Sequence, residues 1–172
     1  NLKIARAQKI LGVRGVVHTA EHLASAIFAL GVPVQDVPRA QLFGGESPFS
    51  GRYAVLHPFA SSDAKRWPAD RFNELARYLK LWQIEPVFLG APHDNLEPFS
   101  SHQLFSGTLS ETKAVISKAY LFIGNDSGPA HMAAAFGIPS LVLFGPSNPA
   151  IWGPWRTASA IVVAPDGLAN VS

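Results

Sequence analysis

The sequence has no cysteine, little charge and no long apolar run, and each lack excludes a class of protein. Without cysteine among its 172 residues it can form neither disulfide bonds nor thiolate metal sites, which is compatible with a reducing cytoplasm. Only 15% of the residues are charged, the net charge is +2, and lysine and arginine are scattered, so nothing indicates an extended nucleic-acid footprint. No stretch has the length of a membrane span or the pattern of a signal peptide.

The composition is nevertheless that of a protein with a full hydrophobic core. Hydrophobic residues make up 48% of the chain, and the length fits one domain with an appendage. Between residues 32 and 51, prolines, glycines and serines interrupt every periodic pattern, which is typical of a connector. We therefore predict a compact domain over residues 52–172 and a separate N-terminal region over residues 1–51. Because the chain begins at Asn1 rather than methionine, we expect it to be part of a longer protein.

One amphipathic helix is predicted before the connector, over residues 17–30, where apolar positions recur at helical spacing. Within it His18, Glu21 and His22 match the H-x-x-E-H pattern of some zinc proteases, which places two histidines one turn apart on one face. The match is short and the sequence shows no evident third ligand, so a solvated helix start is the favoured interpretation. Residues 1–13 carry too short a pattern to assign.

The most informative stretch is residues 120–146, which predicts a strand, a turn, a helix and a strand in succession. A short unbroken apolar run at 120–123 is typical of a strand that is covered on both faces. It stops at the turn and cap residues 124–128, and Pro129 suits the first helical position because it lacks an N–H. An alanine-rich helix follows, and the next strand is predicted over residues 140–144. A helix therefore begins at the carboxyl end of a strand.

Asp126, Ser127, Gly128 and His131 lie at this helix start, where an anionic ligand is the first hypothesis. In an open parallel sheet, ligands bind outside the carboxyl ends of the strands, and a helix N-terminus there offers free N–H groups and positive potential. The alternative is that Asp126 and Ser127 simply cap the helix, and the spacing alone leaves the two interpretations level. His131 favours a ligand such as phosphate, because the helix dipole disfavours an imidazolium in the first turn unless an anion is near, although a lone histidine is more often structural.

A second polar loop, residues 57–68, follows the first β-rich run of the domain. Its Ser61 and Ser62 offer hydroxyls and Lys65 a point charge, a combination that suits phosphate oxygens. Helical spacing resumes after this loop, so the loop opens at the same rim of the sheet as Asp126. A solvated basic loop is the alternative, and the presence of two polar loops at one rim favours phosphate binding.

Asp94 follows the next apolar strand, which is predicted over residues 86–89. In nucleotide-binding α/β folds a carboxylate at such a place can accept hydrogen bonds from ribose hydroxyls, whereas Asp94 could equally cap the turn. A rigid loop near the end of the chain carries Trp152 and Trp155, which either wall a pocket or cover a surface.

The remaining patterns complete an α/β protein. They predict a short strand at 104–106, a capping box that starts a helix at Thr108, and a last strand at 160–164. Strands that alternate with helices favour a parallel sheet, so the predicted fold is a Rossmann-like parallel sheet with helices on both faces.

Three stretches taken together resemble the heptosyltransferases of lipopolysaccharide assembly, glycosyltransferase family 9. They are HPFASSDAKRWP at residues 57–68, GAPHD at 90–94 and NDSGPAHMAAAFGIPSLVLFGPSNP at 125–149. Three ordered motifs with consistent spacing are more specific than any one of them, and the likeness runs from Tyr53 to Trp155. The resemblance implies the C-terminal half of a GT-B glycosyltransferase, in which residues 1–51 are the tail of the first domain and the connector.

The resemblance assigns roles to residues at the rim of the sheet. Lys65 matches the phosphate-binding lysine of the family and is the catalytic residue that we predict, and Asp94 falls where the family places an acidic residue near the ribose. The family motif D-[ST]-G-x-x-H, which holds diphosphate and sugar, matches residues 126–131. The predicted substrate-binding residues are Ser61, Ser62, Lys65, Asp94, Asp126, Ser127, Gly128 and His131. One departure is Phe59, where the family usually has glycine, so a bulky side chain is expected to oppose close approach of the backbone to the ligand.

The implied reaction is inverting, metal-independent transfer of a sugar from a nucleotide-sugar, typically an ADP-heptose, to a lipopolysaccharide core acceptor. Lys65 and the helix start would stabilise the departing diphosphate. No cofactor and no metal is implied, and the base that activates the acceptor is expected in the other domain, so this chain alone is expected to be inactive. The implied enzyme is cytoplasmic, either free or peripheral at the inner membrane. The alternatives are a non-enzymatic nucleotide- or sugar-binding module and an epimerase of the same fold.

Overall fold

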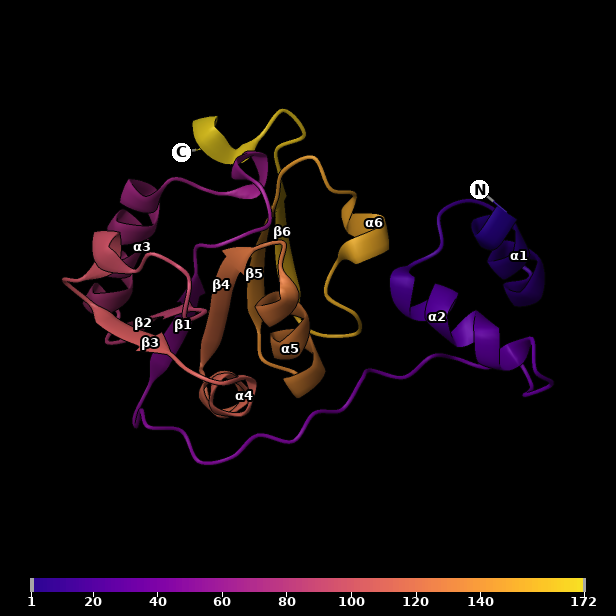
Figure 1. Cartoon of the computed structure of the whole chain (residues 1–172), viewed down its shortest axis with the longest axis horizontal. Coiled ribbons are helices and arrows are strands. Elements are labelled where there is room, and N and C mark those ends of the chain that lie inside the picture. The colour runs from indigo at the N-terminus through magenta and orange to yellow at the C-terminus, as the bar shows by residue number, and fades with distance from the viewer. Residues whose placement is uncertain (1, 172) are drawn as a thin grey trace.

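Six strands form one parallel sheet in the computed structural model of the chain, which describes residues 2–171. The strands are β1 (Tyr53–His57), β2 (Glu85–Gly90), β3 (Gln103–Ser106), β4 (Leu121–Asn125), β5 (Ser140–Phe144) and β6 (Ser159–Val163). Their order is β3-β2-β1-β4-β5-β6, and every neighbouring pair is parallel (Figure 1). This is the order of the doubly wound nucleotide-binding fold, in which the direction of winding reverses between β1 and β4. The predicted Rossmann-like sheet is confirmed.

The helices follow the predicted pattern closely. They are α1 (Leu2–Leu11), α2 (Thr19–Phe28), α3 (Ala69–Leu81), α4 (Leu109–Ser117), α5 (Gly128–Phe136) and α6 (Pro149–Trp152), with 3-10 turns η1 (Asp63–Lys65), η2 (Glu97–Phe99) and η3 (Leu168–Asn170). A capping box of Thr108 and Glu111 begins α4 as predicted, and Gly137, with φ of 76°, ends α5. α1 forms where the pattern was too short to assign, and α6 is a single turn in a segment predicted as loop. No helix within residues 2–171 is long and apolar enough to cross a membrane.

Helices cover both faces of the sheet because side chains alternate along its strands. Tyr53 and Val55 of β1 belong to a core cluster with residues of α4 and α5, whereas Ala54 and Leu56 belong to a cluster with residues of α3. Figure 1 shows α3 on one side of the sheet and α4 and α5 on the other. Strand β1 is buried along its whole length, so the loop that follows it starts from a fixed position.

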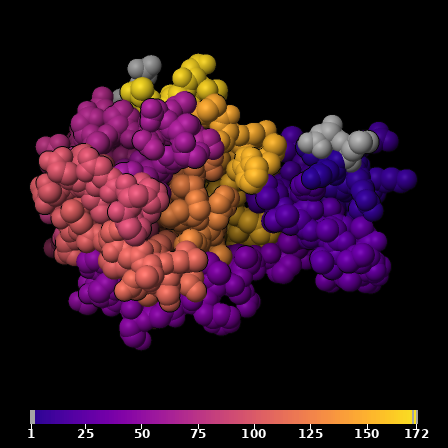
Figure 2. Space-filling model, viewed as in Figure 1, coloured from indigo at the N-terminus to yellow at the C-terminus, as the bar shows by residue number. Residues whose placement is uncertain are grey.

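The N-terminal region lies beside the sheet domain. α1 and α2 contact each other, and the connector runs from them along the edge of the domain to β1 (Figure 1). In the space-filling view of Figure 2 this region projects from the rest of the molecule. Residues 32–51 form neither helix nor strand, as expected of a connector. The division of the chain at residue 52 stays a prediction, and its outer limits, Asn1 and Ser172, lie outside the described residues.

Candidate active site

Two loops at the carboxyl edge of the sheet are fastened together by Asn125. This residue ends β4 and is fully buried, at 0% exposure. Its Nδ2 donates to the Pro58 carbonyl at 2.8 Å, and its Oδ1 accepts from the Trp67 N–H at 3.2 Å. One amide side chain therefore holds both ends of the loop after β1 against the end of β4. From the sequence, Asn125 was interpreted only as a turn residue. The signal that could have revealed its role is a polar amide at the last position of a buried strand.

Lys65 is directed toward this same edge. The turn η1 brings its Nζ within 2.9 Å of Asp126 Oδ2, and the two side chains form an ion pair. The Asp126 side chain is 8% exposed and that of Lys65 is 25% exposed, so water screens the pair only in part. The neighbouring Arg66 turns away and donates to the Ala60 carbonyl and to Asp63. Of the two adjacent cations, Lys65 is the one at the site.

Six of the eight predicted substrate-binding residues meet at one cavity of about 360 Å³ at the start of α5. The cavity is lined by Ser61, Lys65, Asp126, Ser127, Gly128, His131 and Trp152. These residues come from three separate loops, which meet because parallel strands end at the same edge of a sheet. Trp152, which the sequence left as either a pocket wall or a surface cover, is a wall. A cation, two hydroxyls and a helix N-terminus together form a set of groups that bind phosphate oxygens.

The first turn of α5 is open toward this cavity. Ser127 is the N-cap residue, yet its side chain makes no capping hydrogen bond within residues 2–171, and its Oγ lies 3.4 Å from Nδ1 of His57. Gly128 does not have a positive φ, since the positive φ angles of the described glycines fall at other positions. A Cβ on Gly128 would still meet no described atom within 4 Å, so there is room for a ligand over this turn. Free N–H groups that face open space can bind an anion.

Two histidines beside the cavity are held in the neutral form. Burial lowers the pKa of His131 below its ordinary value, the nearby Asp126 carboxylate opposes this shift, and His18 adds to it. Burial also lowers the pKa of His57, to about 4. Both imidazoles are therefore neutral near pH 7 and add no positive charge at the rim. The Lys65 charge is paired with Asp126, so the helix N-terminus is the main source of positive potential there.

The two remaining predicted residues lie elsewhere on the rim. Ser62 precedes η1 and is exposed. Asp94 Oδ2 accepts from the Ala91 N–H at 2.7 Å, so Asp94 closes the turn after β2, as the capping alternative required. A second cavity, of about 320 Å³, borders this turn. It is lined by His57, Leu89, Gly90, Ala91, Pro92, Gly107, Leu109, Thr112, Pro129 and Met132.

The ring of Phe59 is turned toward the core. Its centroid lies 6.3 Å from that of Phe99 and 5.9 Å from that of His57, with an edge-on arrangement in both pairs. Phe59 packs against the core cluster on the α3 face of the sheet. The bulk of this side chain therefore fills space beside the core, and its expected effect on the approach of a ligand stays a prediction.

The H-x-x-E-H segment begins a helix, as favoured from the sequence. His18 is the N-cap of α2, where its Nδ1 accepts from the Ala20 N–H at 3.1 Å and its own N–H donates to Glu21 at 3.3 Å. Since Nδ1 is the acceptor, Nε2 carries the proton that it donates to the Gly153 carbonyl at 2.9 Å. Both ring nitrogens are thus engaged, and His18 keeps no free lone pair for a metal ion.

The fold and the rim together define a class, namely Rossmann-like domains with a polar carboxyl edge suited to an anionic ligand. The family model for glycosyltransferase family 9 (heptosyltransferase) matches residues 36–170 of the chain. The chain belongs to this family, as its three motifs indicated.

Related proteins are longer than this chain. Lipopolysaccharide heptosyltransferase 3 from Escherichia coli is 32% identical over 116 residues, which make up 60% of this chain and 34% of that protein. The chain thus spans about a third of the length of this relative and of its second E. coli counterpart. E. coli ADP-heptose lps heptosyltransferase II has a TM-score of 0.71 at 24% identity, over 93% of this chain and 61% of that one. E. coli heptosyltransferase WaaC with ADP has a TM-score of 0.72 at 20% identity, over 93% and 56%. At these identities the structural match shows the fold.

Proposed function

We propose that the chain is the donor-binding half of a glycosyltransferase that transfers a heptose from ADP-heptose to a lipopolysaccharide core acceptor. The cavity at the start of α5 carries this proposal, since Lys65, Ser127 and open N–H groups converge on it. Family membership supports it, as do a relative named as a lipopolysaccharide heptosyltransferase and a solved structure with ADP. We assign the acceptor and its base to a facing domain.

The diphosphate of the donor fits the cavity that Lys65 and Ser127 line. The ion pair of Lys65 with Asp126 has no net charge, so the attraction for an incoming anion comes first from the N–H groups of α5. The pair also holds the long Lys65 side chain at the rim, which reduces the conformational entropy lost when this side chain binds phosphate. In this assignment Lys65 contacts the diphosphate, and Asp126 positions Lys65.

The nucleoside of the donor fits the second cavity, beside the turn after β2. Its walls include Leu89, Pro92 and Met132, whose apolar surfaces suit the faces of a flat base. Pro129 lines this cavity and the residue before it lines the first, so the two cavities adjoin at the start of α5. Asp94 uses Oδ2 to close the turn, which leaves Oδ1 as the candidate acceptor for a ribose hydroxyl.

The proposed reaction inverts the anomeric carbon and needs no metal ion. As the bond between the anomeric carbon and the diphosphate oxygen breaks, negative charge develops on the departing ADP. Lys65 and the N–H groups of α5 would face that charge and stabilise it. The acceptor hydroxyl attacks from the opposite side of the ring and loses its proton to a base within hydrogen-bond reach, which only a facing domain could present there. The chain alone would therefore bind the donor and transfer nothing.

Calorimetry on the chain tests this function. We expect ADP and ADP-heptose to bind, with the diphosphate contributing more than the sugar, and AMP to bind roughly tenfold more weakly because it lacks the β-phosphate. A heptose-transfer assay should show no product until the separately expressed N-terminal domain is added, which should give slow transfer.

Three results would contradict parts of this function. Robust transfer by the 172 residues alone would contradict the half-enzyme assignment. Nucleotide binding without transfer by the full-length protein would favour a non-enzymatic nucleotide- or sugar-binding module. Failure of every nucleotide to bind would remove the donor site itself.

A further inference from the structure

The turn that carries Lys65 packs on Gly145, a residue outside both cavities that the donor is proposed to occupy. Gly145 directly follows β5 and is buried. A Cβ at this position would overlap the Ala64 carbonyl oxygen and would lie 3.4 Å from Cα of Lys65. Both atoms belong to the backbone of η1, which could make room only if the turn itself moved. Glycine at this position therefore allows η1 to pack directly on the end of β5.

The other member of the ion pair is held by the same strand end. The Asp126 N–H donates to the Leu143 carbonyl of β5 at 3.0 Å, two residues before Gly145. Phe144, which lies between Leu143 and Gly145, is 0% exposed and anchors this strand end in the core. The end of β5 therefore sets the positions of both Lys65 and Asp126, whose charged atoms lie 2.9 Å apart.

Arg66 braces the same loop from within. Its Nε and Nη2 donate to the Ala60 carbonyl at 3.1 and 2.9 Å, and its Nη1 donates to Asp63 at 3.1 Å. The guanidinium fork thus links the first part of the loop to η1, next to Lys65. The Arg66 side chain is 46% exposed, so it shapes the loop without being part of the core.

The position of the turn matters because the stem of a lysine is long and flexible. From a displaced turn, fewer rotamers of Lys65 would reach the diphosphate, and the side chain would lose more conformational entropy on binding it. A displacement of about 1 Å is enough to weaken an oriented contact strongly. Packing that fixes the turn therefore places Lys65 before the donor arrives.

We propose that Gly145 and Arg66 are positioning residues of the donor site, which fix the loop that carries Lys65 and make no contact with the donor themselves. This assignment rests on the proposed function, since it takes Lys65 as a ligand of the diphosphate. Gly145 belongs to the stretch at residues 125–149 that resembles the family, and no binding role follows for it from the sequence alone. Its role follows from the backbone that packs against it.

Gly145→Ala tests this role, because it adds one methyl group under η1 and removes no charge. Gly44→Ala is the matched control, since a Cβ there would also overlap a neighbour, the Ser117 side chain, but in the connector. Calorimetry gives the Kd of ADP and of AMP, and a thermal melt shows whether each variant is folded. Gly145→Ala should weaken ADP by about tenfold and AMP, which lacks the β-phosphate, by less than about twofold. Gly44→Ala should change neither Kd.

A double-mutant cycle with Lys65→Ala separates positioning from a general structural effect. If Gly145 acts through Lys65, adding Gly145→Ala to Lys65→Ala should weaken ADP by less than about a further twofold. Equal losses of ADP affinity in both backgrounds would overturn the assignment. Unchanged ADP affinity in a folded Gly145→Ala would overturn it as well.

Arg66→Lys decides the question if Gly145→Ala does not fold. The substitution keeps the charge, removes the fork that holds the Ala60 carbonyl and affects an exposed side chain. It should weaken ADP by about threefold in the parent chain and have no effect in Lys65→Ala. Unchanged ADP affinity in Arg66→Lys, or the same loss in both backgrounds, would contradict the positioning role.

Failure of the proposed function would look different. If the parent chain bound no nucleotide, Lys65 would have no donor to contact, and a crystal structure of Gly145→Ala would test the packing instead. A Lys65 that no longer pairs with Asp126 in that structure would support its positioning by Gly145. An ion pair that stays at 2.9 Å would overturn it.

Discussion

The sheet domain and the N-terminal region differ in how far their apolar side chains are buried. Within residues 2–171, the buried apolar residues lie almost entirely in the domain, and the N-terminal region adds Ala7 and Val17. That region instead exposes large apolar side chains, namely Ile4, Val13, Val16, Leu23, Ile27, Leu30, Val32, Val34 and Phe43. A unit with its own core can fold alone, whereas a helix pair of this kind needs another surface to cover it.

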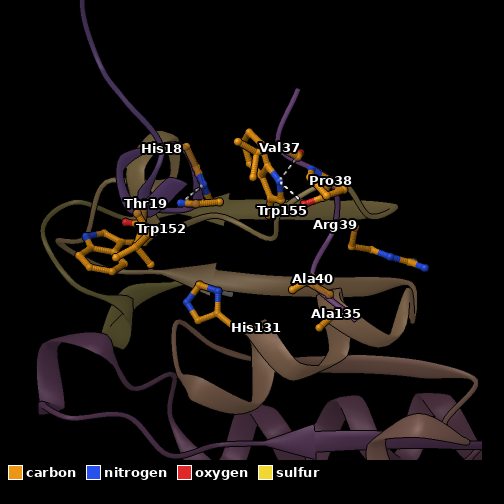
Figure 3. A pocket seen from close by; sticks show the side chains of 13 residues that line it. His18, Thr19, Val37, Pro38, Arg39, Ala40, His131, Ala135, Trp152 and Trp155 are labelled. Atoms are coloured by element: carbon orange, nitrogen blue, oxygen red, sulfur yellow. Dashed lines mark hydrogen bonds between the residues drawn. The ribbon is translucent and has the colours of Figure 1, made fainter. Parts of the chain in front are cut away.

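The difference determines what each region contributes to the site. Residues of the domain alone line the cavity at the start of α5, so the proposed diphosphate binding depends on the core of the domain. A cavity of about 510 Å³ (Figure 3) takes one wall from the N-terminal region, which is tied to the domain by contacts that include the Arg156–Asp36 ion pair at 3.5 Å. The shape of this cavity therefore depends on where the N-terminal region lies, and the two cavities should respond differently to mutation.

The largest expected effect is on the stability of the domain core. Phe122 of β4 is 0% exposed, so Phe122→Ala should lower the free energy of unfolding by about 3–5 kcal/mol. Leu30 of the N-terminal region is 84% exposed, and Leu30→Ala should change the free energy of unfolding by less than about 0.5 kcal/mol. Urea titrations measure both. Equal losses would mean that the two regions share one core.

Acid should weaken the domain through His57. Its pKa in the folded chain is about 4, below the ordinary 6.5, so folding favours the neutral imidazole. The stabilisation of the fold by neutral His57 is complete above pH 6.5 and is lost as the pH falls toward 4. The loss in unfolding free energy is about 3 kcal/mol, at 1.36 kcal/mol per pKa unit. His57→Gln removes the titrating group, so its unfolding free energy should fall less over that range. Parallel pH profiles for the two proteins would contradict this assignment.

In the proposed full-length enzyme, Lys65→Ala should lower turnover by about a hundredfold, because it would remove a charge that is proposed to stabilise the leaving diphosphate. Lys80→Ala is the control, since Lys80 lies on α3 and pairs with Glu85 at 3.9 Å. Steady-state kinetics measure both variants. Unchanged turnover in Lys65→Ala would remove Lys65 from the site.

Gly128→Val should abolish detectable nucleotide binding and leave the fold intact. A Cβ at this position meets no described atom within 4 Å and projects where the ligand is proposed to approach the backbone, so the valine should displace the ligand rather than the protein. Gly45→Val, in the connector, should bind ADP as the parent chain does. Calorimetry measures the ADP affinity of each variant, and a thermal melt shows whether it is folded. Equal affinity in Gly128→Val would mean that this turn only caps the helix.

Chelation should have the smallest effect. The start of α5 supplies positive potential at the rim, where Lys65 is held by Asp126. In the N-terminal region, both ring nitrogens of His18 are already engaged in hydrogen bonds, so neither region is expected to rely on a metal. Treatment with EDTA should leave ADP affinity and turnover of the full enzyme unchanged. Activity restored only by magnesium or manganese would contradict the metal-independent reaction.

Local patterns were sufficient to predict most of the rim. Short apolar runs that are followed by polar loops marked the carboxyl ends of β1, β2 and β4, and parallel strands bring those ends to one edge of the sheet. Lys65 and the turn at 126–128 were therefore placed correctly, while their roles in binding stay predictions. The orientation of the Phe59 ring could not be predicted, because it depends on neighbours that sequence spacing does not specify, and its effect on ligand binding stays a prediction.

The sequence by itself determined the order of strands and helices and the presence of a phosphate-type rim, because these follow from residue periodicity and turn chemistry within a few positions. Only the tertiary structure decided which polar groups form hydrogen bonds within the protein and which stay available to a ligand. Asn125 forms hydrogen bonds that hold the loop after β1, and Trp155 donates to the connector at Val37, which lies 118 positions earlier in the chain. Trp152, three residues before Trp155, has no hydrogen-bond partner for its N–H within residues 2–171. Hydrogen bonds between residues so distant in the chain depend on how the layers pack, and no local pattern records them.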